Sequence, residues 1–482
     1  MSSQSHPMGN DVGVGPDTVA KQHLNLSYAG ALVFFMQAGF AMLEAGIVHP
    51  KNTINILFKN MIDASIAAIG FWLIGYGFAY GKDSGGFIGG SNFALDEVYN
   101  KAGGCTKASD GSWSCSPDGW ESWFFQWAFT GAAATIVAGS VCERTKIGAY
   151  FVYSIIITAF IYPVVVHWVW GTGWLSAWGA YGDNPRPLFT GNTNSNGMID
   201  FAGSGVVHMV GGFSGLMGAI VVGPRIGRFN ADGTVNELYA GNKTLQSLGA
   251  FILWFGWYGF NCGSTLAISG GLGQVAGKVA VNTTIAAAAG AIGATFITFI
   301  FEGHYDISMG LNGLLAGLVG VTANCSVVNP WAALIIGLVA SLILYLGHYL
   351  LLKLKIDDPC DACIVHGFCG MWGVWSAGIF CSDGNIQYAG YPNVNNACAR
   401  GEQFGVQIVG SLVVAAWVMG TAGMTFLAID KTIGMRVSED IEHAGLDASE
   451  HGAVQSQPVP LPQNNFPNMN GNISMYTYPP AF

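Results

Sequence analysis

A series of long apolar segments is the feature that most limits what this chain can fold into. The segments are roughly 18–25 residues long, which is enough for a helix to cross about 30 Å of hydrocarbon, and loops rich in Gly, Pro, Asn or charge separate them. Only 10% of the 482 residues are charged, against about 25% in soluble proteins. The sequence therefore predicts an all-α integral membrane protein in a lipid bilayer. We expect eleven transmembrane helices, at 25–47, 56–80, 120–141, 148–170, 199–222, 245–263, 278–301, 309–327, 331–352, 361–381 and 403–429.

The distribution of Lys and Arg predicts the orientation of these helices. If the amino end lies outside, eleven of the 18 basic residues fall on the inner side and seven on the outer side, as the positive-inside rule requires. An odd number of crossings then leaves the carboxyl end inside. We divide the chain into an extracellular N-terminal segment (1–24), a transmembrane domain (25–429), a cytoplasmic regulatory C-terminal region (430–455) and a tail (456–482) whose Pro, Asn, Gln and Ser predict disorder.

Four cysteines fall in loops on the predicted outer side, where disulfides persist. They are Cys105, Cys115, Cys381 and Cys398. The sequence leaves open which of them pair. The net charge of −10 argues against nucleic acid as a partner.

A duplicated motif opens two of the predicted helices. Asp200 is followed eight residues later by His208, and Asp358 is followed eight residues later by His366; each His follows a Val and precedes a glycine-rich stretch. Five spans separate the copies, so their helices run in opposite directions. This pattern predicts two five-helix inverted repeats plus a final helix. Eight helical residues rise about 12 Å, so helices that start at opposite faces bring both imidazoles close to the midplane.

Two imidazoles at one depth can perform a limited chemistry. Burial disfavours the charged ring, so we expect both rings to be neutral, each with one donor and one acceptor nitrogen. Such a pair can bind a small polar solute or relay a proton. The alternative is that each His only bridges two helices by a hydrogen bond. The carboxylates of Asp200 and Asp358, near the helix starts, can cap free N–H groups.

A second pattern in the tenth span has metal-ligand spacing. It consists of Cys360, Cys363, His366 and Cys369. On one helix, successive members turn by about 300°, which leaves the first and last on opposite faces. We therefore expect no metal site. We also find no nucleophile beside the histidines, and expect neither an enzyme nor a cofactor.

Several motifs occur in order along the chain: Met36-Gln-Ala-Gly-Phe-Ala-Met-Leu-Glu44-Ala-Gly, Lys51-Asn with Lys59-Asn, the 200–212 stretch, Trp254-Phe-Gly-Trp-Tyr-Gly-Phe260-Asn-Cys-Gly-Ser264 and the 357–373 stretch. Together they resemble the ammonium transporter (Amt/Mep/Rh) family, its plant and algal Amt branch most, over nearly all of 25–453. The resemblance implies a multi-pass plasma-membrane protein. It also implies a homotrimer with one pore in each subunit, and ammonium/ammonia and methylammonium as substrates.

The resemblance also implies roles for individual residues. It assigns ammonium recruitment at the outer mouth to Phe129, Trp170 and Ser264, and a two-ring gate to Phe129 and Phe260. The same comparison makes His208 and His366 the pore-lining proton relay. Structural or cation-stabilising acids would be Asp200, Asp358 and Asp361. Without the resemblance, the aromatic residues would be read as packing or interface residues, and Ser264 as a packing or helix-break serine.

Moving a cation without its water into an apolar pore costs several kcal/mol or more. A contact with an aromatic face stabilises the cation by only about 0.5–2 kcal/mol. The preferred mechanism is therefore release of the proton, passage of ammonia and separate relay of the proton. In the resembling family the segment after Arg436 is a regulatory tail that docks on the neighbouring subunit, and Ser449 is the candidate phosphosite. A sensor that binds ammonium with little flux is the competing function.

Overall fold

The computed structural model describes residues 16–100, 105–107, 113–115, 119–177, 197–238, 241–391, 398–399 and 401–453. For 16–20, 99–100, 105–107 and 113–115 it describes the backbone only. The long helical segments, some of them made of several consecutive pieces, are α1 (Pro16–Ile47), α2 (Thr53–Gly70) with η2 (Phe71–Gly75) and α3 (Tyr76–Tyr80), α5 (Trp120–Val141), α6 (Ile147–Ile156) with η5 (Ile157–Ile161) and α7 (Tyr162–Val169), η6 (Ser204–Met209) with α8 (Val210–Val222), α9 (Lys243–Gly263), α10 (Leu272–Glu302), α11 (Ile307–Thr322), α12 (Pro330–Lys353), η7 (Cys363–Phe368) with α13 (Cys369–Phe380), and α15 (Glu402–Thr432).

The remaining elements are short. The helices are η1 (Pro50–Asn52), η3 (Phe93–Leu95), α4 (Asp96–Asn100), α14 (Asp383–Tyr388), α16 (Glu439–Ala444) and α17 (Leu446–His451). The strands β1 (Asp83–Ser84) and β2 (Ile88–Gly89) form one antiparallel hairpin, and β3 (Cys105–Lys107) and β4 (Trp113–Cys115) form another. Both hairpins lie in connections between helices.

A helical segment overlies each predicted apolar span. Within the described residues, nine of these segments are long and apolar enough to cross a membrane, and α11 is apolar but shorter, at 16 residues. The all-α membrane fold is therefore confirmed. The number of eleven crossings and the orientation stay predictions.

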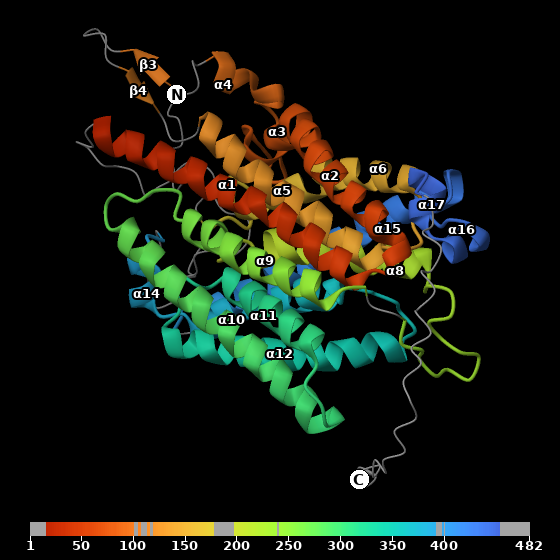
Figure 1. Cartoon of the computed structure of the whole chain (residues 1–482). Helices are drawn as coiled ribbons and strands as arrows, with labels where there is room; N and C mark the ends of the chain where they lie inside the picture. The colour runs from red at the N-terminus through yellow and green to blue at the C-terminus, as the bar shows by residue number, and fades with distance from the viewer. Residues whose placement is uncertain are drawn as a thin grey trace.

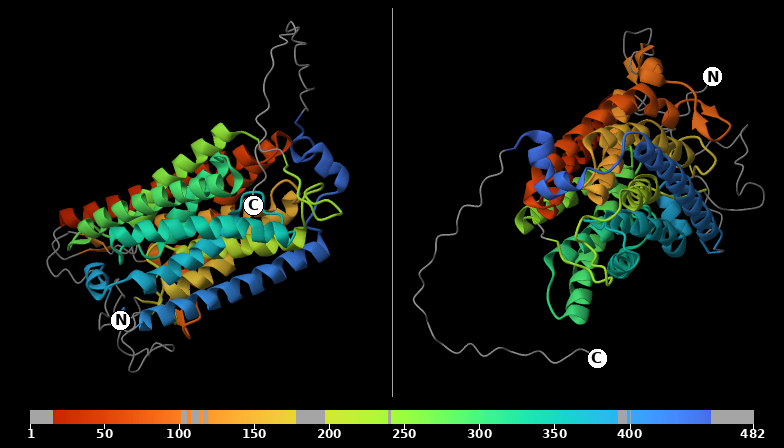
Figure 2. Two further views of the ribbon diagram at one scale, coloured as in Figure 1. Left: turned by 90° about the horizontal axis from the view of Figure 1, so that it is seen from below. Right: turned by 90° about the vertical axis from the view of Figure 1, so that its right-hand side faces the viewer.

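The helices pack side by side as one bundle (Figure 1). Helix α1 lies against α5 and α9, α8 lies against α5 and α15, and α10 packs on both α11 and α12. The β3–β4 hairpin and α14 lie at one end of the bundle, whereas α16 and α17 lie at the other end (Figures 1 and 2). The bundle therefore has two distinct ends, and the predicted outer loops and the inner tail are at opposite ones.

Small residues allow the helix backbones to approach closely. A Cβ atom on Gly46 of α1 would lie 2.2 Å from the backbone nitrogen of Gln246 in α9, and a Cβ on Gly249 would lie 2.2 Å from that of Leu43. No side chain fits at such positions. Lipid chains are as apolar as these side chains, so moving a side chain from lipid into the protein gives little free energy. In a bilayer, close packing of this kind therefore holds the helices together.

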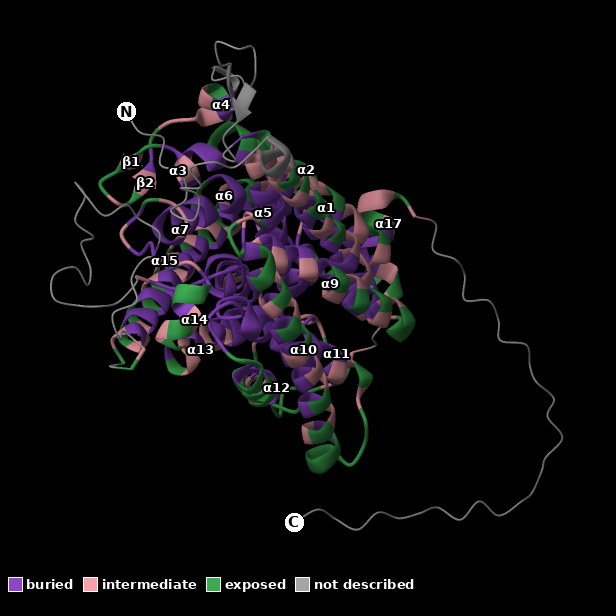
Figure 3. Ribbon diagram, turned by 90° about the vertical axis from the view of Figure 1, so that its left-hand side faces the viewer, coloured by how far each residue is buried: buried purple, intermediate pink, exposed green. Residues whose placement is uncertain are grey.

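Large apolar side chains face outward from the bundle. On α10, the side chains of Ile292, Phe296 and Ile300 are 56%, 54% and 71% exposed, and their spacing of four residues places them on one face. Figure 3 shows the buried residues gathered in the interior, with exposed residues along α10 and α12. An apolar surface of this kind requires lipid or another subunit as its neighbour.

The four outer cysteines lie in two loops. A disulfide joins Cys381 to Cys398. Cys105 and Cys115 are directly opposite each other in the β3–β4 register, and their side chains lie outside the described part of the chain.

Candidate functional site

The two motif histidines lie in irregular turns of their helices. His208 is in η6 and His366 is in η7, and both turns are π-helical. A π turn adds a residue to the helical repeat and is frequent at functional sites. Gly203, immediately before η6, has a φ of +111°, a left-handed conformation that favours glycine.

The acid of each motif caps the turn that carries the histidine. The Asp200 carboxylate accepts hydrogen bonds from the backbone N–H groups of Gly203, Gly205 and Val206 at 3.0, 2.9 and 2.8 Å. In the second copy, Asp358 accepts one from Cys363 N–H at 2.7 Å and one from the thiol of the same residue at 2.6 Å. Both carboxylates thus satisfy the free donors of a helix start.

The inverted arrangement brings the two imidazoles into direct contact. Nδ1 of His208 lies 3.2 Å from Nδ1 of His366, and the ring centroids are 5.2 Å apart at an interplanar angle of 22°. Their exposed fractions are 0% and 4%. One nitrogen of this contact must donate and the other accept, so the two rings share one proton between them. We call this pair the twin histidines.

Aromatic rings extend the stack on the side of His208. Its ring is stacked on Trp257, with centroids 5.1 Å apart, and on Phe260, with centroids 5.4 Å apart. The indole of Trp257 is fixed by a 2.9 Å hydrogen bond to Thr322 Oγ1. The sequence motif contained Trp257, but its spacing gave no sign that it packs on a histidine.

Two glycines set the distance between the repeats at this depth. A Cβ on Gly212 of α8 would lie 2.1 Å from the backbone nitrogen of Gly367 in η7. Each of these glycines lies within four residues of a histidine. The backbones therefore approach closely enough for the imidazoles to meet.

The predicted gate and recruitment residues are brought together on the far side of Phe260. The rings of Phe129 and Phe260 have centroids 4.1 Å apart, and both side chains are fully buried. Trp170 meets Phe129 edge-on at 5.8 Å, and its indole donates to the Asp200 carbonyl at 2.7 Å. The Ser264 hydroxyl donates to the Phe260 carbonyl at 2.8 Å, which leaves its oxygen free to accept.

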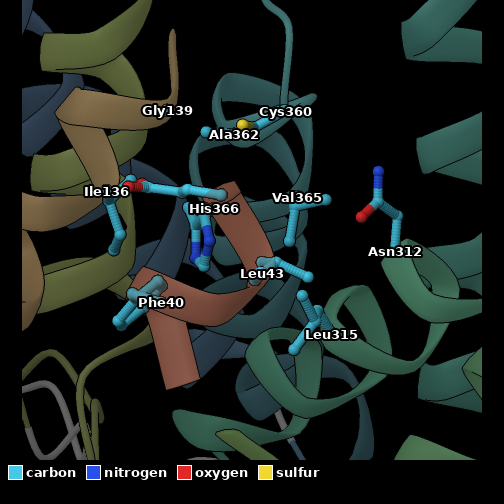
Figure 4. Close-up of a pocket in the computed structure, with 11 residues that line it drawn as sticks. Phe40, Leu43, Ile136, Gly139, Asn312, Leu315, Cys360, Ala362, Val365 and His366 are labelled. Atoms are coloured by element: carbon cyan, nitrogen blue, oxygen red, sulfur yellow. The ribbon is translucent and has the colours of Figure 1, made fainter. Parts of the chain in front are cut away.

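A small cavity lies on the side of His366. It is lined by Phe40, Leu43, Glu44, Ile136, Gly139, Asn312, Leu315, Cys360, Ala362, Val365 and His366. Figure 4 shows the His366 ring among Phe40, Ile136 and Val365. The space open to the centre of a water-sized sphere is about 20 Å³, whereas one water needs about 10–15 Å³. The cavity thus has room for one small molecule such as water or ammonia.

Asp361 lies apart from the twin histidines. Its carboxylate accepts from His348 Nδ1 at 2.7 Å and from the Asn312 amide at 3.2 Å. His348 lies late in α12, and its ring is paired with this acid. Asp361 therefore ties α12 and α11 to the start of the tenth span.

The four residues with metal-ligand spacing do not converge. No group of three or more potential ligands is found among the described residues. The thiol of Cys363 donates to Asp358, as given above, and that of Cys369 points to the Ala340 carbonyl at 3.6 Å.

The C-terminal segment that follows α15 is folded onto the start of α2 and the residues before it. The Asp447 carboxylate accepts from the backbone N–H groups of Ile54 and Asn55 at 3.0 and 2.8 Å, which caps α2. Lys51 Nζ donates to the carbonyls of Glu442 and His443 at 2.8 and 2.9 Å. Docking on a neighbouring subunit, which the family resemblance implied, stays a prediction.

Comparison with known proteins agrees with this geometry. Residues 25–456 match the Ammonium Transporter Family. Amt2 of Archaeoglobus fulgidus is 40% identical over 88% of this chain and 86% of its own, and ammonium transporter 1 member 3 of Solanum lycopersicum is 41% identical over 89% and 91%.

Solved structures agree as well. A structure titled Sensor Amt Protein is 33% identical and superposes with a TM-score of 0.77 over 90% of this chain and 99% of its own. Candida albicans Mep2 is 27% identical and gives 0.75 over 91% and 92%. The chain belongs to the ammonium transporter family, and is a multi-pass membrane transporter rather than an enzyme.

Proposed function

We propose that this transporter recruits ammonium at its outer mouth, removes one proton and conducts ammonia through the pore while the twin histidines relay the proton. The observation that carries this proposal is the 3.2 Å contact between Nδ1 of His208 and Nδ1 of His366. The Nε2 atoms lie on the opposite edge of each ring. A proton that arrives at one Nε2 can therefore release a proton from the other after a transfer between the two Nδ1 atoms.

Recruitment rests on the group formed by Phe129, Trp170 and Ser264. Two aromatic faces near the mouth attract a cation by about 0.5–2 kcal/mol each. The serine oxygen supplies an acceptor with direction. Asp200 contributes indirectly, because its carboxylate is occupied by three backbone donors and its carbonyl fixes the indole of Trp170.

The gate selects against ions that keep their charge. The rings of Phe129 and Phe260, with centroids 4.1 Å apart, leave no room for a hydration shell. An ion that passes must therefore lose its water, at a cost of several kcal/mol. Ammonium avoids that cost by giving up a proton, which potassium cannot do.

The inner tail provides regulation in this proposal. Ser449 lies in α17 between Asp447 and Glu450, and its hydroxyl donates to the Gly445 carbonyl at 3.0 Å. Glu450 accepts from Asn55 at 2.6 Å, so α17 is held to α2 on both sides of the serine. A phosphate added there would repel these carboxylates and loosen the docked tail.

Several expectations complete the proposal. The chain divides at 24, 429 and 455 as described above, its amino end faces outward, and it acts as a homotrimer in the plasma membrane. The distribution of Lys and Arg carries the orientation, and the resemblance to the Amt/Mep/Rh family carries the homotrimer, the plasma membrane and methylammonium as a second substrate.

Uptake of labelled methylammonium tests the proposal in cells that lack their own ammonium carriers. We expect His208→Ala and His366→Ala to lose uptake or selectivity against potassium, because the relay then has a gap. A matched control is His304→Ala, since His304 is exposed at the end of α10. If both pore variants transported and selected like the parent, the relay mechanism would be wrong.

A sensor function has one observation in its favour. The structure titled Sensor Amt Protein superposes on nearly its whole length, and the tail of the present chain is docked where a change in the pore could reach it. Binding of ammonium without uptake in the same cells would favour the sensor, whereas uptake at a rate that supports growth on ammonium favours the transporter.

A further inference from the structure

We propose that Glu44 is the group at which the relayed proton and ammonia recombine on the inner side of the pore. This inference rests on the proposed deprotonation mechanism and extends it by one residue. Glu44 lies near the end of α1 and its side chain is 2% exposed. It follows Phe40 by one turn, or about 6 Å along the helix axis, and the Phe40 ring is 6.2 Å from that of His366.

Glu44 and His366 line the same cavity. A Cβ on Gly139, which also lines it, would lie 3.3 Å from Oε1 of Glu44. The other carboxylate oxygen, Oε2, accepts from the Asn60 amide at 2.6 Å. The carboxyl group is therefore held by one oxygen, while the other lies at the wall of a space large enough for one ammonia molecule.

The position is unusual for a structural carboxylate. The neighbouring cation, Lys59, is 1% exposed and donates to the carbonyl of Thr145 at 3.0 Å, so it is not directed at Glu44. A carboxylate buried without a bonded cation is costly, and ionisable groups at membrane depth are commonly functional.

Other residues of the cavity are poorer proton carriers. Among the described residues that line it, only Glu44, Cys360 and His366 can gain or lose a proton. A thiol has an ordinary pKa of about 8.5 and a glutamate of about 4.3, so a protonated carboxyl group is the stronger acid and gives up its proton to ammonia more readily than a thiol. The amide of Asn312 can bind ammonia but cannot protonate it.

The step is a pair of proton transfers. His366 receives the relayed proton from His208 and passes one proton on to the Glu44 carboxylate, so that one N–H bond of His366 forms, another breaks and an O–H bond forms on Glu44. Ammonia in the cavity then takes this proton, so that the O–H bond breaks and a fourth N–H bond forms. Ammonium leaves toward the inner solution and Glu44 returns to its carboxylate form. No electrons are exchanged.

Ammonium-evoked currents of the full-length protein in liposomes test this role, with Glu44→Gln as the variant. Glutamine keeps the size and the hydrogen bond from Asn60 but cannot carry a proton. We expect the initial current near neutral pH to fall at least about tenfold, since a positioned acid–base group contributes about 10²–10⁴-fold to a proton transfer. Acidifying the inner-side solution should restore part of the current, because solution protons then reach the ammonia.

A matched control is Glu302→Gln, at the end of α10, where the carboxylate accepts from the Tyr349 hydroxyl at 2.5 Å and does not line the cavity. It should leave the current and its pH profile unchanged. If the Glu44→Gln current were reduced by the same factor at every inner pH, Glu44 would only fasten α1 to α2. If the current of this variant equalled the parent's, Glu44 would have no role in transport. Either outcome overturns the proposal.

Two further variants separate this proposal from the one on which it rests. If His366→Ala is impaired while Glu44→Gln is parent-like, only the role of Glu44 is wrong. If His366→Ala is itself parent-like, the relay is wrong as well. Should Glu44→Gln fail to assemble, Glu44→Asp replaces it: it withdraws the carboxyl by one methylene, and a current equal to the parent's would overturn the proposal.

Discussion

The Asp200→Asn substitution measures how much the capped π turn contributes to stability. In the parent, Oδ1 of Asp200 accepts from Gly203 N–H, and Oδ2 accepts from Gly205 N–H and Val206 N–H. Asparagine can turn its oxygen to the place of Oδ2, where it still accepts from Gly205 N–H and Val206 N–H. Its NH₂ group then meets the Gly203 N–H group, which loses its acceptor inside the protein.

The magnitude follows from the number of lost bonds. A hydrogen bond to a charged group contributes about 1.5–3 kcal/mol, so one lost bond predicts a decrease of about 1.5–3 kcal/mol in the free energy of unfolding. Asp358→Asn is the matched control from the second repeat. Oδ1 of Asp358 makes no hydrogen bond among the described residues, so asparagine can turn its oxygen toward Cys363. The expected loss is then about 1 kcal/mol.

Reversible unfolding in mixed micelles, with a rising fraction of denaturing detergent, gives both free energies. We expect Asp200→Asn to unfold at a clearly lower fraction than Asp358→Asn. Equal stability of the two variants would refute the capping argument. So would an Asp200→Asn variant whose free energy of unfolding lies within about 0.5 kcal/mol of the parent's, which is the usual effect of a neutral surface substitution.

Three more perturbations follow from the structure. Gly212→Ala places a methyl group against the Gly367 backbone, so the repeats must separate; we expect a loss of about 1–3 kcal/mol in mixed-micelle unfolding, and slower methylammonium uptake. Asp357 is a buried carboxylate in the inner loop that Arg225 binds through Nε and Nη2 at 2.8 and 2.9 Å. Burial acts to raise the pKa of Asp357, but the hydrogen bonds and charge of Arg225 outweigh it and hold this pKa well below its usual range. The pair therefore stabilises the fold above about pH 4, the ordinary pKa of Asp, and its contribution decreases as the pH falls below that value. We expect Asp357→Asn to lower the free energy of unfolding by about 3–5 kcal/mol at neutral pH and by less in acid. Unfolding measured at several pH values tests this. Ser449→Asp should lower methylammonium uptake severalfold, with Ser449→Ala close to the parent, and equal uptake by the two would contradict regulation at this serine.

Helix positions and the matched level of the twin histidines along the bundle were predictable from the sequence. The apolar spans have a length that only a membrane helix explains, and the repeated spacing from Asp200 to His208 and from Asp358 to His366 follows from helical rise alone. These are local properties, because they depend on residues close together in the chain. The prediction that both acids lie at helix starts belongs to the same class.

Contacts between distant segments were beyond the reach of the sequence. Nothing near His208 indicates that Trp257 stacks on it, and nothing near Glu44 indicates that its carboxyl shares a cavity with His366. The π turns were also missed, since no residue type marks them. The lateral distance between the imidazoles depends on how closely Gly212 and Gly367 pack, which is a property of two helices 155 positions apart.

In the proposed mechanism, selectivity depends on the proton relay. The ring pair of Phe129 and Phe260 lies on one side of the twin histidines and the small cavity lies on the other. Between them, the only ionisable side chains of the described stack are the two imidazoles. If ammonium crossed this path with its charge, potassium would meet the same desolvation cost, about several kcal/mol, and would be rejected no more strongly. Selectivity then requires that the proton leaves the substrate, and a proton that leaves must travel through His208 and His366. A variant that loses the relay but still admits a cation must therefore admit potassium too.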